Sequence, residues 1–505
     1  MALIVLLSAC LVATSTEQVP RELVVIAINH LPPAQQVLAL TMQGLANRTA
    51  ARVWIEDGGM QAVILRDLEQ AGTSVRRVLS PWDLLPLLGP DHPSAIAYHG
   101  PGQGVTVAIA LCAARGAVAV DESLRSEALD RGLTIIADAS GWDEARVWRE
   151  HQRDFARGIM VEQDPRKTGH LLDLAVARRA FTTFGQPDAV VTQRVKDLGP
   201  DTQVFGWGDD ELAIVSRVSA GGGSYLPADW SRNLSALQHL PTAILLPPRA
   251  APGAQVMTGE RLVTFVMSDG DNLQFLGGPF STSPGHWGSP LRGSFTMTWE
   301  IAPLLATCAP RVMAKLYGAA SHGQSIDDFV SGPSGAGYCF PALLPDRRRF
   351  AEYTVAHLRA SRLRIVSVLN AGGDMTQTRE LLEQPDVLGV IYKDYAPYNA
   401  KQGALWWHQG KPCMAYRFLL WEGLLGQDPE GVAAAIGKLP AEPATDPASY
   451  VLINVHAWSY KENGGPMAAV QRTIARLPSS TRVVGASELF TQLRQHFGVP
   501  VLPAP

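Results

Sequence analysis

Short apolar runs alternate with amphipathic stretches along the first half of the chain. The runs are rich in Val, Ile and Ala, while stretches between them, such as residues 34–46 and 60–71, carry apolar residues at helical spacing. Strands that alternate with helices are typical of an α/β layer with a mainly parallel sheet. We therefore predict an N-terminal α/β region over residues 21–250, with buried strands at 22–28, 51–56, 94–99, 116–121 and 133–138.

The second half of the chain repeats the order of strand and then helix. Eight such units are typical of a TIM-like (β/α) barrel, which we predict for residues 256–500. Glycine and proline gather at residues 220–224 and 247–255, and we interpret these two stretches as a linker before the barrel. The predicted barrel strands are 261–267, 294–299, 328–331, 363–369, 387–392, 412–418, 450–455 and 482–486.

Composition and charge narrow the range of partners. With 505 residues, the chain is longer than a single hydrophobic core usually supports. Its composition, with 46% apolar and 18% charged residues, is ordinary for a globular enzyme. The net charge of -4 is small, and no Lys/Arg-rich run occurs. We therefore expect neither nucleic acid nor an anionic membrane surface as a partner.

The N-terminus predicts export. Residues 3–12 are apolar and too short to span a bilayer, and Leu7-Ser8-Ala9-Cys10 resembles the lipobox at which bacterial lipoproteins are cleaved and acylated on cysteine. The usual basic residues before the apolar run are missing, so we favour a truncated lipoprotein signal over a secretion signal cut near Ser15. Residues 1–20 then predict a periplasmic, cell-surface or secreted bacterial protein whose membrane contact is a lipid anchor at Cys10.

The remaining cysteines predict neither zinc nor disulfides. They show no CxxC or CxH spacing, and we expect buried small side chains at these positions. The same spacing predicts no metal site. No GxGxxG or Walker loop occurs in the N-terminal region, so no cofactor is predicted. The four cysteines are Cys112, Cys308, Cys339 and Cys413.

Two carboxylates in the segment SDGDN are the strongest catalytic candidates. Asp269 and Asp271 follow the first predicted barrel strand, at the end where barrel enzymes carry their catalytic groups. Two residues apart on a strand, they would point the same way, and mutual repulsion would keep one of them protonated near neutral pH. A raised pKa is what a general acid needs. The alternative is a structural Asp-Gly turn, and the next residue, Asn272, is a candidate for substrate binding.

Further candidates follow other predicted strands. Asp394, in YKDYAPYN, is interpreted as the partner carboxylate of the SDGDN pair or as a solvated aspartate paired with Lys393. His456, in INVHAWSY, either polarises a carboxylate or is a structural residue at a strand end. Glu422, in LLWEG, is a weaker catalytic candidate, with Glu300 and Asp374 behind it. Tyr395, Trp458 and the segment Trp406-Trp407-His408 are candidates for sugar contacts.

The segment GPSGAGYCFP places a glycine turn before an aromatic pair. Gly335 and Gly337 permit backbone angles that other residues avoid, and Pro341 fixes its own angle, so the loop is expected to present Tyr338 and Phe340 to a sugar ring. The alternative is a packed surface turn.

GAGYCFP resembles the signature of the GxGYxYP putative glycoside hydrolase family. Three further segments are similar to that family, so the resemblance extends from about residue 22 to about residue 497. Phe340 stands where the family signature has its second tyrosine, which keeps a ring and deletes a hydroxyl. The three segments are MQGLANR (residues 42–48), PADWSRNLSAL (residues 227–237) and VTFVMSDGDNLQF (residues 263–275).

Three functions remain open, and we rank them from the most to the least favoured. The first is a glycoside hydrolase that acts on a polysaccharide or glycoconjugate, with one carboxylic acid protonating the glycosidic oxygen and a second carboxylate as nucleophile or base. The second is a metal-dependent carbohydrate esterase, because VTFVMSDGD is loosely similar to the TFDDG strand end of polysaccharide deacetylases, although their HxxxH pair is missing. The third is a non-catalytic glycan-binding lipoprotein.

Overall fold

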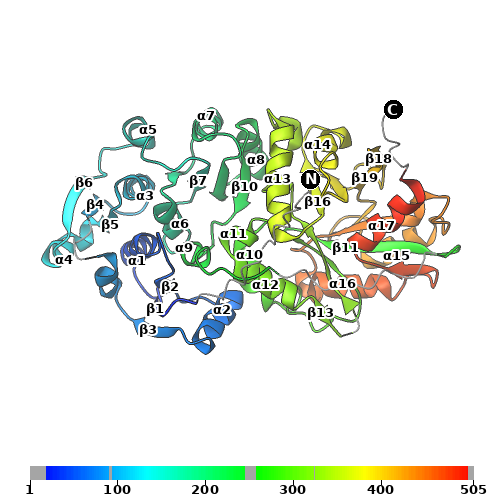
Figure 1. Cartoon of the computed structure of the whole chain (residues 1–505), viewed down its shortest axis with the longest axis horizontal. Coiled ribbons are helices and arrows are strands. Elements are labelled where there is room, and N and C mark those ends of the chain that lie inside the picture. The colour runs from blue at the N-terminus through cyan, green and yellow to red at the C-terminus, as the bar shows by residue number, and fades with distance from the viewer. Residues whose placement is uncertain (1–18, 90–93, 245–256, 324, 499–505) are drawn as a thin grey trace, which may run out of the picture.

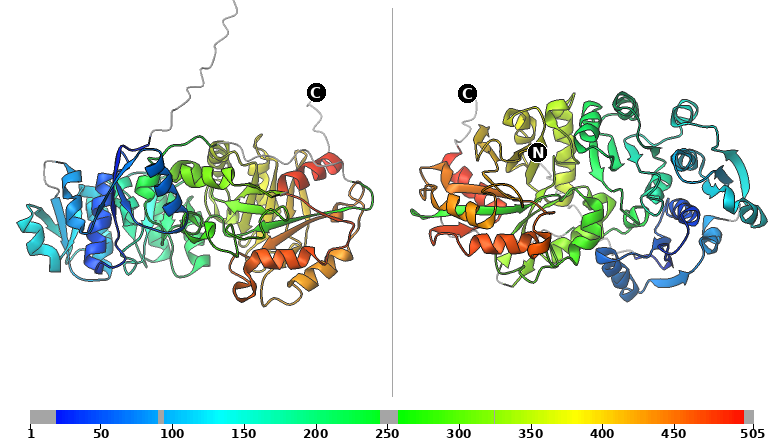
Figure 2. Two further views of the ribbon diagram at one scale, coloured as in Figure 1. Left: turned by 90° about the horizontal axis from the view of Figure 1, so that it is seen from below. Right: turned by 180° about the vertical axis from the view of Figure 1, so that it is seen from behind.

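The computed structural model describes residues 19–89, 94–244, 257–323 and 325–498. The predicted lipoprotein-like segment and the stretch 247–255 of the predicted linker lie outside these residues, apart from residues 19 and 20. The molecule is elongated, and Figure 1 shows its N-terminal half at one end and its C-terminal half at the other. The views in Figure 2 show the same arrangement from two further directions.

The N-terminal half is α/β with parallel strands, as predicted, but it holds three small sheets. Their strand orders are β2-β1-β3, β5-β4-β6 and β10-β9-β7-β8, and every pairing in them is parallel. The five predicted strands are all present with slightly different ends. The strands are β1 (Glu22–Ile26), β2 (Val53–Ile55), β3 (Ser74–Val78), β4 (Ser94–Tyr98), β5 (Val118–Asp121), β6 (Thr134–Asp138), β7 (Ile159–Glu162), β8 (Phe181–Thr183), β9 (Gln203–Gly206) and β10 (Ser224–Pro227).

Nine helices cover these sheets within residues 19–89 and 94–244. Both helices that the spacing predicted are present, and α1 begins with prolines, which favour the first turn of a helix. The helices are α1 (Pro33–Ala46), α2 (Gly59–Gln70), α3 (Gln103–Arg115), α4 (Arg125–Asp130), α5 (Glu144–His151), α6 (Leu172–Arg178), α7 (Asp188–Leu198), α8 (Glu211–Ala220) and α9 (Leu234–Leu237).

The prediction of a flexible linker at residues 220–224 is wrong. This stretch is the tight turn between the end of α8 and the start of β10. A Cβ on Gly223 would lie 2.5 Å from the carbonyl oxygen of Thr202, so glycine permits the close approach of two backbones here. The glycines therefore serve packing in this turn.

The C-terminal half is built on one curled sheet. Its order is β18-β19-β17-β16-β15-β12-β11-β21-β20, with β22 also paired to β11, and only the β18–β19 pair is antiparallel. A two-stranded sheet of β13 (Ser321–His322) and β14 (Ser325–Ile326) stands apart. The strands of the curled sheet are β11 (Arg261–Met267), β12 (Thr298–Ile301), β15 (Asp328–Ser331), β16 (Ile365–Asn370), β17 (Gly389–Asp394), β18 (Leu405–His408), β19 (Lys411–Ala415), β20 (Phe418–Leu420), β21 (Tyr450–Val455) and β22 (Thr481–Val483).

The prediction of a TIM-like barrel is confirmed only in part. All eight predicted strands exist. However, β22 pairs with the first residues of β11, on the same edge of β11 whose last residues pair with β12. The other edge of β11 pairs with β21, so β22 does not follow β21 in the sheet. Instead, the segment between β19 and β20 connects β17 on one side of the curled sheet with β21 on the other. The amide of Tyr416 donates to the carbonyl oxygen of Tyr392 in β17, and the amide of Arg417 donates to that of Leu452 in β21.

Helices pack on the outside of the curled sheet. Phe490, in the last helix, lies so close to Gly389 that a Cβ there would be 2.3 Å from its ring. All four cysteines of the described residues are buried and free, as predicted. No helix within the described ranges is long and apolar enough to cross a membrane. The helices are α10 (Leu273–Gly277), α11 (Leu305–Cys308), α12 (Pro310–Gly318), α13 (Arg347–Ser361), α14 (Arg379–Leu382), α15 (Pro429–Gly437), α16 (Gly465–Ile474) and α17 (Ala486–Phe497).

The GAGYCFP segment joins the two halves. The amide of Tyr225, in β10, donates to the carbonyl oxygen of Tyr338 over 2.7 Å, and the amide of Tyr338 donates back over 2.8 Å. The amide of Phe340 donates to the hydroxyl of Ser219, in α8, over 2.9 Å. These contacts hold the third N-terminal sheet beside α13, as Figure 1 shows.

Candidate active site

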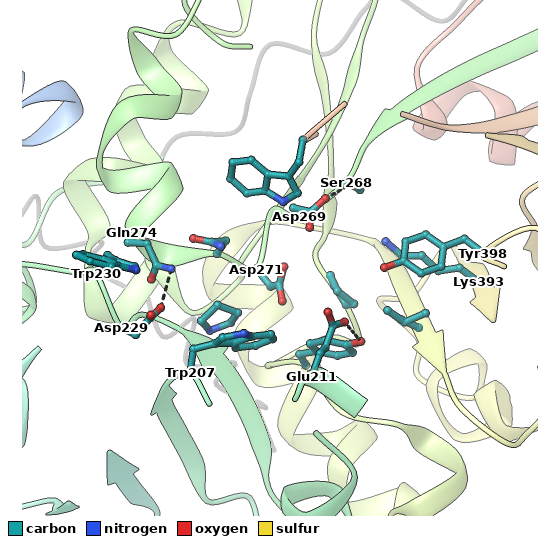
Figure 3. Close-up of a pocket in the computed structure, with 16 residues that line it drawn as sticks. Trp207, Glu211, Asp229, Trp230, Ser268, Asp269, Asp271, Gln274, Lys393 and Tyr398 are labelled. Atoms are coloured by element: carbon teal, nitrogen blue, oxygen red, sulfur yellow. Dashed lines mark hydrogen bonds between the residues drawn. The ribbon is translucent and has the colours of Figure 1, made fainter. Parts of the chain in front are cut away.

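A pocket of about 350 Å³ lies at this junction, where the third N-terminal sheet faces the carboxyl ends of β11 and β17. Figure 3 shows its lining side chains, which come from both halves of the chain. The N-terminal half contributes Trp207, Glu211, Pro227, Asp229 and Trp230. The C-terminal half contributes, among others, Ser268, Asp269, Asp271, Asn272, Gln274, Tyr338, Lys393, Tyr398 and Trp458.

A tight turn after β11 brings two carboxylates into the pocket. Asp269 has a φ of 65°, and the hydroxyl of Ser268 donates to its carboxylate. A Cβ on Gly270 would lie 1.6 Å from the carbonyl oxygen of Glu300, so only glycine fits between the carboxylates. Asn272 then accepts a hydrogen bond from the amide of Phe275 over 3.1 Å and caps α10. The Asp-Gly turn is therefore present, and the same turn places Asp269 and Asp271 in one pocket.

Asp271 is a buried carboxyl group at the centre of this lining. It is 7% exposed and has no side-chain hydrogen-bond partner among the described residues. Burial raises its pKa well above the ordinary value, the nearby carboxylates of Asp269 and Glu300 raise it further, and Lys393 opposes them. A raised pKa favours the protonated form of this carboxyl group, which is the form that a general acid needs.

A buried ion pair lies beneath the pocket. The ammonium of Lys393 is 2.8 Å and 3.1 Å from the two carboxylate oxygens of Glu300, and the hydroxyl of Ser367 donates to the same carboxylate over 2.5 Å. Burial raises the pKa of Glu300, and the charge of Lys393 opposes this rise. Lys393 thus lines the pocket as a cation whose charge is already balanced.

Glu211 enters the pocket from the N-terminal half. It is the first residue of α8, and the phenol of Tyr338 donates to its carboxylate over 2.8 Å. Burial raises the pKa of Glu211, the bond from Tyr338 opposes this, and the charge of Asp269 raises it again. Tyr338, in the GAGYCFP segment, therefore positions a carboxylate from the N-terminal half of the chain.

Asp229 and the aromatic residues form a second side of the pocket. Lys167 pairs with the carboxylate of Asp229, and the amide of Gln274 donates to it over 3.0 Å. Trp230 is half exposed, and the ammonium of Lys167 lies 4.9 Å from the centre of its ring. Flat ring faces beside hydrogen-bonding groups are typical of carbohydrate sites. Figure 3 shows this group, with Trp207 nearby, on one side of Asp271.

Five of the predicted site residues line the pocket, and the glycines of the turn do not. A Cβ on Gly335 would lie 2.6 Å from Thr354, and one on Gly337 would lie 2.6 Å from the hydroxyl of Ser224. Both glycines therefore allow the turn to pack against its neighbours. The five residues in the pocket are Asp269, Asp271, Asn272, Tyr338 and Trp458.

Phe340 and Tyr395 lie next to each other outside the pocket lining. The ring of Phe340 is fully buried, with its centre 5.5 Å from that of Tyr338 and 5.7 Å from that of Tyr395. The position where the family signature has a second tyrosine is therefore part of a core in this chain.

Asp394, Glu422 and His456 also lie outside the pocket lining. Neighbouring residues on a strand point to opposite faces, so Asp394 faces away from the pocket that Lys393 lines, and its carboxylate is 3.8 Å from Lys401. Burial raises the pKa of Asp394. The Lys393–Asp394 pairing considered from the sequence is therefore wrong, because Lys393 pairs with Glu300.

His456 and Glu422 make local contacts. The imidazole of His456 stacks on Trp421 at 3.7 Å and is 2.7 Å from the hydroxyl of Ser459, and burial lowers its pKa. Glu422 is exposed and accepts hydrogen bonds from the amide of Tyr460 and the side chain of Asn463.

The weaker candidates also have local roles. Asp374 is exposed and caps a short turn by accepting from the amide of Thr376 over 2.8 Å. Trp406, Trp407 and His408 belong to β18 at the edge of the curled sheet and do not line the pocket.

Several lining residues were not identified from the sequence. Glu211 follows β9 in the segment GWGDDEL, so its place after a strand was a usable signal. Asp229 and Trp230 lie within PADWSRNLSAL, one of the family-like segments. Lys393 and Tyr398 carried no signal beyond their places near the end of β17 and in the loop after it. No group of three or more His, Cys, Asp or Glu side chains within the described residues is arranged to hold a metal ion.

This fold and site can be compared with known proteins. The model described as GxGYxYP putative glycoside hydrolase C-terminal domain matches residues 260–494, and the GxGYxYP third domain matches residues 157–239. The chain belongs to the GxGYxYP putative glycoside hydrolase family. The pocket lies between the two matched regions.

One solved structure with a similar fold is a putative hydrolase from Bacteroides thetaiotaomicron VPI-5482. It is 25% identical, with a TM-score of 0.84, and the match covers 95% of this chain and 96% of that chain. No curated protein matches the chain.

Proposed function

We propose that this protein is a glycoside hydrolase that acts on a polysaccharide or glycoconjugate by carboxylate acid/base catalysis. The observation that carries the proposal is the buried carboxyl group of Asp271 beside Asp269, in a pocket with exposed tryptophan faces. The family and the similar structure, a putative hydrolase, support hydrolysis as the reaction class.

Asp271 is the general acid in this proposal, and it protonates the oxygen of the scissile glycosidic bond. Glycosidases need a second carboxylate as nucleophile or base, and Asp269 or Glu211 has the position for that role. Lys393 lies at the pocket floor and opposes the rise in the pKa of Asp271, so it limits how strongly the acid holds its proton.

The proposal also includes the fold of the C-terminal half and the location of the protein. The curled sheet serves as a TIM-like barrel, since the pocket lies at the carboxyl ends of its strands, where such enzymes carry their sites. The lipobox-like segment directs the export of the protein, and outside the cytoplasm it encounters extracellular glycans.

A screen of the purified protein on polysaccharides and glycoconjugates tests the proposal. Asp269→Asn and Asp271→Asn keep side-chain size but remove the ionisable group, so at least one of them should lower turnover by roughly 10²- to 10⁴-fold. Asp210→Asn is the matched control, because Asp210 caps α8 next to Glu211 without lining the pocket. If both pocket variants melt like the wild type and retain its turnover, the pair is a structural turn.

Chelation separates the hydrolase from the alternative esterase. Carboxylates alone suffice for glycosidic acid/base chemistry, so turnover should survive dialysis against EDTA. Loss of turnover that zinc or cobalt restores would assign the activity to a metal-dependent carbohydrate esterase. A protein that binds glycans but releases neither sugar nor acetate would be a binding lipoprotein.

A further inference from the structure

The charges that line the pocket do not balance. Asp229 is paired with Lys167, and the cation of Lys393 is paired with Glu300. The other three carboxyl groups, Glu211, Asp269 and Asp271, have no ion-pair partner in the described part of the chain, and Lys393 is the one basic residue among those that line the pocket. Even with Asp271 in its neutral form, Glu211 and Asp269 therefore leave the pocket negative and without a resident counter-ion.

Asp271 points independently to a missing ligand. More than nine-tenths of this residue is buried, yet its carboxyl group has no side-chain partner among the described residues. Figure 3 shows it in the middle of the pocket, with Asp269 on one side and Glu211 with Trp207 on the other. Buried polar groups in native proteins are almost always hydrogen-bonded, so an unpartnered carboxyl group at a pocket wall is one that a ligand can pair, as donor or as acceptor.

The carboxylate of Asp269 also disfavours further negative charge beside it. The charge of Asp269 raises the pKa of both Glu211 and Asp271, on top of the effect of burial. A ligand that brings a positive charge relieves this repulsion, whereas a carboxylate, sulfate or phosphate on the ligand would increase it. Arginine, the usual partner of such anionic groups, does not occur among the lining residues.

The walls around these carboxyl groups fit a sugar ring. Trp207, Trp230 and Trp458 line the pocket, and Trp230 and Trp458 are 54% and 37% exposed. Tryptophan faces stack on sugar rings and also attract cations. Trp230 already has one cation near its ring, the ammonium of Lys167.

We propose that the pocket binds a sugar unit with a free amino group, such as a glucosamine or galactosamine unit, and holds its ammonium between Glu211 and Asp269. The inference rests on the proposed function in taking a glycan as the ligand. Tyr338 then has a positioning role, because its phenol fixes the carboxylate of Glu211 at the pocket wall.

Binding of single sugars to the full-length protein tests this inference. The probes are D-glucosamine and D-galactosamine, each compared with its N-acetyl derivative and with its parent hexose, by ligand-observed NMR titration at pH 6. The amino sugars should bind at least about tenfold more tightly, which corresponds to about 1.4 kcal/mol. Equal affinity, absence of binding by the amino sugars, or tighter binding of glucuronic acid would overturn the inference.

A pair of variants tests the position of the ammonium. Glu211→Gln removes the charge but keeps an acceptor for Tyr338, so it should reduce the affinity for amino sugars by about tenfold and that for the parent hexoses by less. Asp210→Asn removes a neighbouring charge outside the pocket and should leave both affinities unchanged. If Glu211→Gln melts like the wild type and binds amino sugars equally well, the proposed position is wrong.

The outcomes also distinguish this inference from the proposed function. Hydrolysis of neutral glycans without preference for amino sugars would overturn the inference and leave the hydrolase proposal standing. Tight binding of amino sugars, with no turnover of β-1,4-linked glucosamine oligomers or of any glycan in the panel, would support the inference and count against hydrolysis.

Discussion

At the scale of single residues, the pocket carries a cost in stability. Asp271 is buried beside a second carboxylate and lacks a side-chain partner, whereas the other buried charges nearby are paired. A carboxyl group in this environment favours its neutral form. Such a local conflict in an otherwise well-packed region is typical of a functional site.

The pH dependence of stability measures this cost. Because the pKa of Asp271 is raised well above 3.8, the native protein keeps this proton at pH values where the unfolded chain has lost it. The native state then binds more protons, so the free energy of unfolding falls as pH rises from about 3.8 toward the native pKa, by up to about 1.4 kcal/mol per pH unit.

Asp271→Asn lacks this proton, so its stability relative to the wild type should increase steadily over that pH interval. Urea unfolding from pH 4 to pH 8 measures the difference, with Asp210→Asn expected to follow the wild type. Parallel curves for Asp271→Asn and the wild type would show that Asp271 ionises normally.

Sequence alone identified the pocket residues that lie directly after strands or in distinctive motifs. Asp269 and Asp271 follow β11, and Tyr338 lies in the GAGYCFP segment. Glu211 and Lys393 were not identified, because their importance depends on which strands and helices meet in space. The place of Glu211 after β9 suggests a site residue, but it does not indicate that this residue will face β11.

At the scale of elements, the pattern of apolar runs predicted the strands well. Each predicted strand is present, with ends shifted by a few residues, because a buried parallel strand needs a short, nearly continuous apolar run. The order of the strands was less predictable. The bend between β19 and β20 and the pairing of β22 with β11 are set by packing between distant elements.

The GAGYCFP turn tests packing at this scale. Gly337→Ala would place a methyl group 2.6 Å from the hydroxyl of Ser224 and 3.1 Å from the carbonyl oxygen of Tyr225, so the turn and β10 must move apart. We expect a loss of about 1–3 kcal/mol in the free energy of unfolding, as for other overpacked sites.

Chemical denaturation measures this loss. Gly318→Ala is the matched control, since a Cβ there at the end of α12 meets no atom within 4 Å, and it should be neutral or slightly stabilising. Wild-type stability in Gly337→Ala would mean that the turn adapts without strain, and this result would contradict the packing role of the motif.

At the scale of the whole molecule, the pocket exists because the two halves are held together. Its carboxyl groups come from α8, from the turn after β10 and from the turn after β11, and no single half supplies all of them. The motif therefore has a structural role in the junction as well as a role in the pocket, through the backbone and the phenol of Tyr338. Small shifts at the junction are expected to change the site.

Two substitutions at the junction separate buried from exposed contacts. Ser219→Ala removes the acceptor of the Phe340 amide, which leaves a buried N–H without a partner at a cost of about 1–3 kcal/mol. Lys315→Gln removes the exposed ion pair with Asp67, between α12 and α2, and should cost about 0–1 kcal/mol. Neither residue lines the pocket, so any effect on binding reports the fit of the halves.

We expect Ser219→Ala to lower the melting temperature and to raise KM more than it lowers kcat, because a looser junction moves Glu211 away from Asp269 while Asp271, the proposed general acid, remains in the C-terminal half. Lys315→Gln should match the wild type in both respects. The measurement is a melting curve together with steady-state kinetics on a glycan found in the screen. A variant Ser219→Ala that is destabilised but binds substrate normally would show that the site tolerates movement between the halves, and the two-sided pocket would then not be required for recognition.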